Sequence, residues 1–248
     1  MGNSTSSKMP PLEEFNALHP RDPRVKCLGH GTDAMPSSAT GQLIKIHFDS
    51  NWLKKSTKIY TTPNNTEYAG GIELKRHNKT RVRLLDGQGR SIAECIQLNA
   101  FSTPKCRVYG TKAKFIGQKP SVDHRQINGD PLYEWANVKM KGGEQGFQMK
   151  MVNDGGDSPT SRDDILRTVQ VPGPTGPIIL ITRGDQPAGY FRRDRNFLKG
   201  TDMKWDVTIS PGVDPYLVLS LIVSMTQIER RNERDNTAAA FAGALVTA

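Results

Sequence analysis

Two short stretches of this sequence concentrate cationic side chains that could hold phosphate groups: "LKRHNKTRVR" and "GYFRRDRNFLK". Arg and Lys donate charge-assisted hydrogen bonds to phosphate oxygens, so several of them on one fixed surface can bind a phosphorylated headgroup. The candidate anion-binding residues are Lys75, Arg76, Lys79, Arg81 and Arg83 in the first stretch, and Arg192, Arg193, Arg195 and Lys199 in the second.

Arg81 and Arg83 alternate with Val82 and Leu84. This period of two is typical of a strand with one face on a core and the other in water, so both arginines are expected on the same outer face. A second interpretation stays open, because the outer face of any such strand must be polar and Arg is a common choice there.

The N-terminus matches the pattern for N-myristoylation, M-G-x-x-x-[ST], with Gly2 as the acceptor and Ser6 at the required position. The alternative is a plain Ser-rich disordered tail. One acyl chain gives only marginal membrane binding, and a basic surface would supply the second signal. The conjunction of Gly2 and the arginines favours a peripheral membrane protein.

The composition and motifs narrow the classes of function. A net charge of +9 favours an anionic partner. No G-x-S-x-G, P-loop, G-x-G-x-x-G or H-E-x-x-H motif occurs, and the three cysteines form no CxxC pair, so we expect no catalytic residue, no metal site and no cofactor. Nucleic-acid binding is a less favoured alternative, because aromatic content is only 7% and no ribonucleoprotein motif is present.

Alternating apolar residues dominate the chain from Gln42 onwards, for example in "IKIHF", "RVRLL", "FQMKM" and "WDVTI". Turn clusters such as "DGQGR", "KGGEQG" and "RGDQPAG" separate these runs. The spacing predicts about ten to twelve short strands in a sandwich or barrel, with no helix before residue 214. Residues 1–40 lack any sustained period and are predicted to form a flexible arm.

The run "PYLVLSLIVSMTQIER" predicts a helix over about 215–230, with Asp214 as N-cap and Pro215 as its first residue. It is apolar nearly all round, apart from a stripe of Ser220, Ser224 and Gln227, so it must be buried on every side. About 14 apolar residues extend roughly 21 Å, short of the ~30 Å core of a bilayer, so no transmembrane segment is expected. A closed barrel could enclose such a helix.

The stretch "WDVTISPGVDPYLVLSLIVSMTQIE" resembles the end of the Tubby C-terminal-like fold, and within it the LURP-one-related family. The stretches "RVRLLDGQGRSIAECIQL", "LYEWANVKM" and "ILITRGDQPAGYFRRD" support the likeness, which covers about residues 42–229. The resemblance implies a mainly β protein, in which a closed antiparallel barrel of about twelve strands surrounds a central hydrophobic C-terminal helix. The expected organisation is an arm over 1–40, the barrel domain over 41–230 and an Ala-rich tail over 231–248. This tail is expected to be disordered, and the alternative is a weak continuation of the helix.

Tubby proteins bind phosphoinositide headgroups, and phospholipid scramblases are relatives of the same fold. The resemblance therefore implies a non-enzymatic adaptor that binds anionic phospholipid or phosphoinositide headgroups, and possible protein partners, at the cytoplasmic face of a membrane. The expected location is cytoplasmic, with association to the plasma membrane through N-myristoylation of Gly2. Two alternatives stay open: a scramblase-like lipid transporter and a basic nucleic-acid-binding regulatory protein. The scramblase alternative lacks the clustered cysteines and the acidic calcium segment of those relatives.

Overall fold

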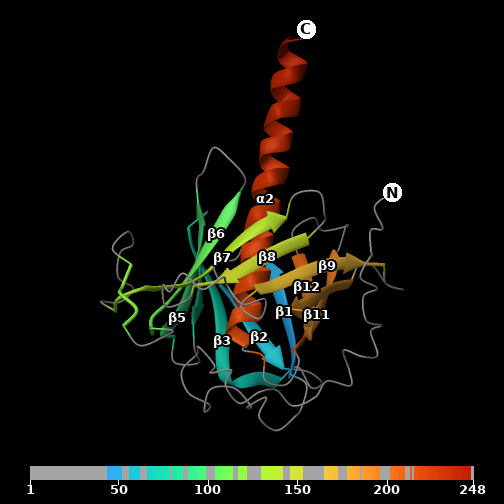
Figure 1. Ribbon diagram of the computed structural model, residues 1–248. Coiled ribbons are helices and arrows are strands. Elements are labelled where there is room, and N and C mark those ends of the chain that lie inside the picture. Colours follow the sequence, from blue (N-terminus) through green and yellow to red (C-terminus); the bar gives the residue numbers. More distant parts are fainter. Residues whose placement is uncertain are drawn as a thin grey trace, which may run out of the picture.

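The computed structural model places a mainly β body around one long helix (Figure 1). It describes residues 44–51, 56–61, 66–78, 80–85, 89–98, 104–113, 117–121, 130–141, 146–152, 165–172, 178–184, 186–195, 202–209, 213 and 215–246. The predicted arm over 1–40, with Gly2, lies outside the described residues.

In the described part of the chain, twelve strands and one helix follow one another. The first six strands are β1 (Ile44–Asn51), β2 (Ser56–Thr61), β3 (Thr66–Asn78), β4 (Arg81–Leu85), β5 (Ser91–Leu98) and β6 (Lys105–Gly110). The rest are β7 (Tyr133–Lys141), β8 (Gly146–Met151), β9 (Ile165–Val171), β10 (Ile178–Arg183), β11 (Gln186–Arg195), β12 (Asp202–Ile209) and the helix α2 (Pro215–Val246).

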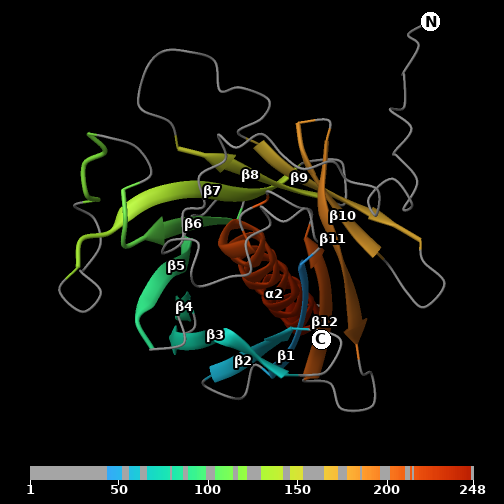
Figure 2. The same ribbon diagram turned by 90° about the horizontal axis from the view of Figure 1, so that it is seen from below.

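Each strand pairs antiparallel with its neighbours in the chain, and β1 also pairs with β12, so the strand order is cyclic. Ile44 lies opposite Ile209 and Asn51 lies opposite Asp202 at the two ends of this last pairing. The strands therefore form a closed barrel around α2 (Figure 2). The predicted mainly β architecture with one hydrophobic C-terminal helix is confirmed.

The alternation read from the sequence sets which side chains face the interior. Val82 and Leu84 of β4 are buried, as are Phe147, Met149 and Met151 of β8. Side chains at every second position lie on the same side of a strand, and here that side faces the barrel interior. The intervening residues therefore form the outer wall.

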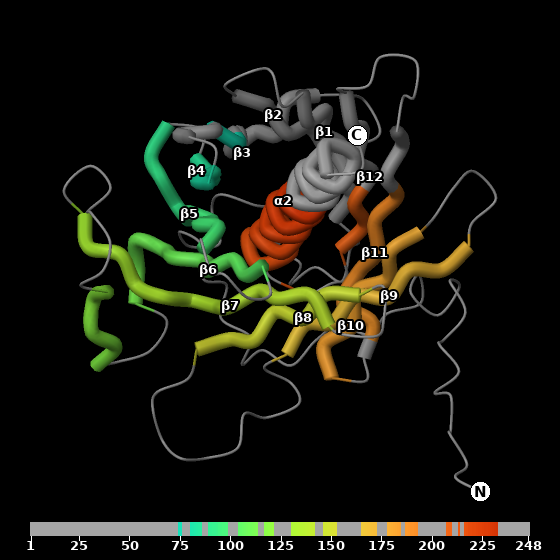
Figure 3. Tube along the Cα trace, turned by 90° about the horizontal axis from the view of Figure 1, so that it is seen from above, coloured from blue at the N-terminus to red at the C-terminus, as the bar shows by residue number. Residues whose placement is uncertain are grey.

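The enclosed part of α2 is buried on all sides, without a break from Val218 to Ile228. Its most extensive contacts are with β5, β6 and β7, which curve around it in Figure 3. Small wall residues such as Ala93 and Ala136 allow this close approach. The helix is therefore an apolar core element of the barrel, as its sequence predicted.

The polar stripe of α2 faces β5 and β6, where two cysteines point inward. The Cys95 thiol donates to the Ser220 carbonyl and the Cys106 thiol to the Ser224 carbonyl, each at 3.6 Å between sulfur and oxygen. Cys106 also lies 3.7 Å from Oε1 of Gln227. These contacts place weak sulfur donors against the one polar side of the helix, so the stripe fixes the rotation of α2 about its axis.

A glycine allows β6 and β7 to pack closely beside the helix. A Cβ atom added to Gly110 would lie 1.8 Å from ring atoms of Trp135, so the indole occupies the space that a side chain would need. Trp135 is 1% exposed, and its Nε1 donates to the Lys112 carbonyl at 2.8 Å. Gly110 is thus required by the close approach of the Trp135 ring.

The predicted end of the helix near 230 and the predicted disordered tail over 231–248 are wrong, because α2 continues to Val246. The sequence after Arg230 contains six Ala residues, which are the strongest helix formers, and no proline. A helix that is already nucleated inside the barrel adds further turns at little cost. In the described part of the chain, no helix combines the length and apolar character needed to cross a membrane.

Candidate anion-binding surfaces

The two cationic stretches selected from the sequence lie on well-separated strands. The first belongs to β3 and β4, and the second to β11 and the segment after it. The shorter path round the barrel from β4 to β11 passes β3, β2, β1 and β12, which is five of twelve steps. The two stretches therefore lie on nearly opposite sides of the barrel and do not form one site.

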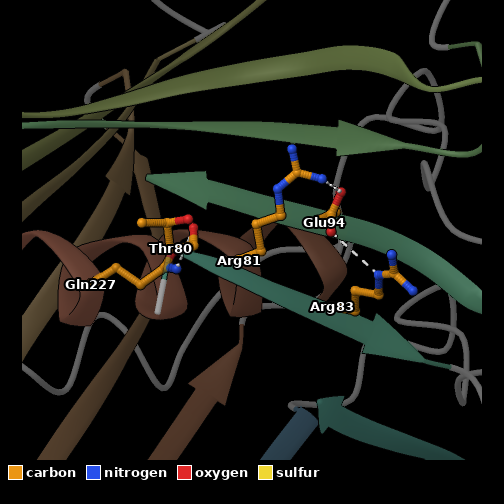
Figure 4. A network of polar contacts seen from close by, with 5 residues as sticks. All are labelled: Thr80, Arg81, Arg83, Glu94 and Gln227. Atoms are coloured by element: carbon orange, nitrogen blue, oxygen red, sulfur yellow. Dashed lines mark hydrogen bonds and ion pairs between the residues drawn. The ribbon is translucent and has the colours of Figure 1, made fainter. Parts of the chain in front are cut away.

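Within the first stretch, Arg81 and Arg83 lie on the outer face of β4, as predicted, and they share one carboxylate. Glu94 of the neighbouring strand β5 lies directly opposite Arg83. Its Oε1 is 3.3 Å from Nε of Arg83, and its Oε2 is 3.9 Å from Nη1 of Arg81 (Figure 4). We call Arg81, Arg83 and Glu94 the arginine surface.

The Glu94 side chain is fully buried, whereas those of Arg81 and Arg83 are 25% and 22% exposed. A buried carboxylate must be balanced by a positive charge, because removing it from water is costly. Glu94 therefore neutralises part of the positive charge that the sequence suggested for an external phosphate. Lys75, which lies opposite Arg83 on β3, is exposed and adds one cation beside this group.

The remaining predicted residues add little to the arginine surface. Arg192 is half-buried on the outer face of β11, next to the buried Phe191, and its Nε makes no hydrogen bond among the described residues. Arg76, Arg193 and Arg195 have backbone positions in β3 and β11, and Lys79 and Lys199 lie outside the described residues.

A different cationic surface is assembled from single residues of four consecutive strands, β6 to β9. Lys105 of β6 lies opposite Lys139 of β7, and Lys139 in turn lies opposite Gln148 of β8. Gln148 lies opposite Arg167 of β9, so one row of cross-strand neighbours contains three cations. Lys150 of β8 lies opposite Asn137 in the adjacent outer row. We call Lys105, Lys139, Lys150 and Arg167 the lysine surface.

All four side chains of the lysine surface are exposed. Among the described residues, no acidic side chain forms an ion pair with any of them. Like charges directly opposite each other in a sheet are destabilising, and Lys105 and Lys139 are such a pair. From β6 to β9 the cations span three strand spacings, about 14 Å, which gives an extended, positively charged area.

The acidic residue nearest to this area in the sheet is already occupied. Glu134 of β7 lies 3.7 Å from Nη1 of Arg107 and accepts a hydrogen bond from Asn137 at 2.7 Å. Arg107 also donates to the Tyr109 hydroxyl at 3.5 Å. Because Glu134 is engaged with these partners, it does not balance the positive charge of the lysine surface.

Sequence reasoning missed the lysine surface because its members lie in four separate strands, none of which holds more than two cations. Each one adjoins a buried position, for example Cys106 after Lys105 and Leu166 before Arg167. This alternation would have placed each side chain outward. Only the strand register brings the four together, and register is a property of the folded sheet.

The described residues do not suggest metal or thiol chemistry. No group of three or more His, Cys, Asp or Glu side chains in the described part of the chain is arranged to hold a metal ion. Burial raises the pKa of the Cys95 thiol to about 12, and burial followed by the neighbouring Cys95 raises the pKa of the Cys106 thiol as well. Both thiols are therefore protonated and unreactive at neutral pH.

Comparison with known proteins gives only a fold-level likeness. No known family model matches the sequence, and no curated protein matches it significantly. A crystallographically solved protein from Arabidopsis thaliana is similar in structure, with 15% sequence identity and a TM-score of 0.46. The similar region covers 76% of this chain and 93% of the plant protein.

Proposed function

We propose that this chain is a non-catalytic, Tubby-like protein of the LURP-one-related type that binds the anionic headgroups of a bilayer as a peripheral adaptor. The observation that carries the proposal is the lysine surface, with four exposed cations that have no acidic partner among the described residues. The cyclic order of twelve strands around a buried helix supports the assignment of the fold type.

The size of the lysine surface favours a bilayer over a single headgroup. Its cations spread over about 14 Å of a gently curved wall, so several lipid phosphates can be contacted at once. Each Lys or Arg close to an anionic membrane contributes about 1 kcal/mol to binding, and the contribution falls off within a Debye length. Four such residues give an affinity that depends strongly on salt.

The nine cations selected from the sequence have a secondary place in this proposal. Lys75, Arg81 and Arg83 supply additional positive charge, part of which Glu94 offsets. Myristoylation of Gly2 would add a hydrophobic anchor. The proposed location of the protein at the cytoplasmic face of the plasma membrane rests on that modification. Mass spectrometry of the N-terminal peptide from a eukaryotic host tests this part separately.

Vesicle flotation of the full chain tests the proposed function. The vesicles contain neutral phosphatidylcholine alone, or with phosphatidylserine or a phosphoinositide at equal total charge. We expect binding to both anionic compositions and little to the neutral one. The lysine-surface variant carries Lys105→Gln, Lys139→Gln, Lys150→Gln and Arg167→Gln. Its binding should be weaker by roughly 100- to 1,000-fold, since four contributions of about 1 kcal/mol are lost.

The matched control removes the same number of exposed cations from other parts of the described surface. It carries Lys75→Gln, Arg90→Gln, Lys112→Gln and Lys119→Gln. The control removes one secondary cation, Lys75, and should lose clearly less affinity than the lysine-surface variant. Equal losses would show that only net charge matters, and tighter binding to RNA or DNA at the same salt would favour the nucleic-acid alternative.

A further inference from the structure

The exit of α2 from the barrel is fixed by contacts with the ends of three strands. Nε2 of Gln227 donates to the carbonyl of Thr80, just before β4, at 3.1 Å. One turn later, Nη1 of Arg231 donates to the carbonyl of Leu98, the last residue of β5, at 2.7 Å. Nδ2 of Asn232 lies 3.6 Å from the sulfur of Met140, near the end of β7. These contacts define an exit mouth through which the helix leaves in one direction.

Beyond Asn232 the helix continues to Val246 and projects from the barrel (Figure 1). These 14 residues (246 minus 232) extend about 21 Å at 1.5 Å per residue. The first few are charged, in "ERD", but the ten residues from Thr237 to Val246, "TAAAFAGALV", include no charged residue. The barrel therefore carries an uncharged helical projection at its exit mouth.

Part of the lysine surface lies at the same mouth. Lys105, the first residue of β6, lies opposite Leu98, whose carbonyl binds Arg231. Lys139 immediately precedes Met140, which contacts Asn232 and is itself 38% exposed. Two exposed cations that are cross-strand neighbours thus lie beside the point at which the helix emerges.

We infer that the exit mouth faces an anionic bilayer and that the segment Thr237–Val246 of α2 enters its interfacial region. This inference rests on the proposed function and assigns the side of the barrel that meets the membrane. Ten residues extend about 15 Å, half of the ~30 Å hydrocarbon core, so the segment reaches into one leaflet and does not span the bilayer. Lys105 and Lys139 then lie at the level of the headgroups.

The two features complement each other physically. The uncharged segment is rich in Ala, so the apolar surface that it can bury is modest and its affinity for neutral lipid is low. The two lysines bring the mouth to an anionic surface, where insertion adds a second contribution. Stable peripheral binding generally requires two such signals.

Vesicle binding by two paired variants of the full chain tests the inference. Phe241→Gln with Leu245→Gln removes two apolar side chains spaced by four residues, which lie on the same side of a helix. The control, Asn236→Gln, changes a polar position that lies just before the segment, and neither variant alters the net charge. We expect about tenfold weaker binding to phosphatidylserine vesicles for the first pair and less than a twofold change for the control.

The outcomes separate this inference from the proposed function. If the unmodified chain fails to bind anionic vesicles, both are overturned. If it binds and the Phe241→Gln, Leu245→Gln variant binds equally well, only the inference is overturned. Self-association without lipid, detected by sedimentation velocity and abolished by the same pair, would also overturn it by assigning the segment to a second copy of the chain.

A fluorescent label measures how deeply the segment Thr237–Val246 enters the bilayer. Leu245→Cys is labelled with a polarity-sensitive fluorophore in a Cys27→Ser background, since the Cys95 and Cys106 thiols are buried. Lipids with a quencher on the acyl chain should quench this label on anionic vesicles and leave a label at Asn232→Cys unquenched. Equal quenching at the two positions, or none at either, would contradict insertion of the segment.

Discussion

The arginine surface and the lysine surface lie on neighbouring parts of the same outer wall, yet an acidic side chain balances the positive charge of the first and not that of the second. Arg81 and Arg83 are close in sequence but share the buried Glu94. Lys105 and Arg167 are more than sixty positions apart in the numbering, and the register of β6 to β9 brings them into one row. Local cationic density is therefore a poor guide to the charge available to a partner, which depends on the neighbouring strands.

The difference also separates structural from functional use of charge. Glu94 lies within 3.9 Å of both arginines, so removing the two arginines leaves a buried charge without these partners. The lysine surface has no such dependence and contains one repulsive cross-strand pair, Lys105 and Lys139. The first surface is expected to contribute to stability, and the second to binding.

The largest expected effect comes from breaking the arginine surface. Arg81→Met with Arg83→Met leaves the fully buried Glu94 carboxylate without these counter-charges. The free energy of unfolding should fall by about 3 kcal/mol, at the lower end for buried pairs because both arginines are partly exposed. Urea denaturation measures the loss. Adding Glu94→Gln should recover most of it, and an unchanged denaturation midpoint in the double variant would contradict the structural role.

On the inner face of the same β5 and β6 strands, the two buried thiols make stability sensitive to high pH. The pKa of Cys95 is raised from 9.0 to about 12 in the folded chain, so the folded state binds its proton more tightly than the unfolded state. The contribution of this thiol to the free energy of unfolding is therefore fully present below pH 9. It is lost between pH 9 and about pH 12, by up to about 1.4 kcal/mol per pH unit.

Urea denaturation at about pH 8 and about pH 10.5 measures this decline. The Cys95→Ala, Cys106→Ala variant is the control, because its lysines and tyrosines still titrate but its thiols do not. The decline should be clearly smaller in the control. Parallel pH profiles would show that the thiols titrate alike in the folded and unfolded chains.

A smaller effect is expected from distorting the strands that carry half of the lysine surface. Gly110→Ala places a methyl group where the Trp135 ring lies, at 1.8 Å from its atoms. Overpacking of this kind costs about 1–3 kcal/mol. Thermal unfolding followed by near-ultraviolet circular dichroism reports both stability and the environment of Trp135. Gly89→Ala is a control without a steric clash, although its positive φ of 75° carries its own strain.

The smallest effect on stability should come from the lysine surface itself. The variant with Lys105→Gln, Lys139→Gln, Lys150→Gln and Arg167→Gln removes exposed cations and one repulsive pair. Its free energy of unfolding should change by less than about 1 kcal/mol, with a slight gain. A loss comparable to that of the Arg81→Met, Arg83→Met variant would remove the contrast between the two surfaces.

Much of the architecture was predictable from the chain, for identifiable reasons. The strand alternation around Val82, Leu84 and Met149 correctly assigned their burial, because a period of two is independent of the partner strand. The apolar run from Tyr216 to Ile228 correctly predicted an enclosed helix. The end of that helix was wrongly predicted, because the loss of apolar pattern was taken as the loss of helical structure.

The candidate sites were less predictable. Residue type and alternation placed Arg81 and Arg83 on the outside, but nothing local in the sequence pairs them with Glu94, eleven positions beyond Arg83. The predicted residues on β11 fall on the far side of the barrel from β4, since strand order in a closed sheet cannot be read from local pattern.

The sequence by itself determined the elements of this protein: outward and inward sides of strands, and an all-round apolar helix that required a complete enclosure. These properties are local, because they follow from side-chain periodicity and helix propensity. The tertiary structure alone decided which charges are neighbours, since cross-strand register joins residues from separate segments. It also decided that Glu94 is buried beside two arginines while Lys105, Lys139, Lys150 and Arg167 share an exposed wall.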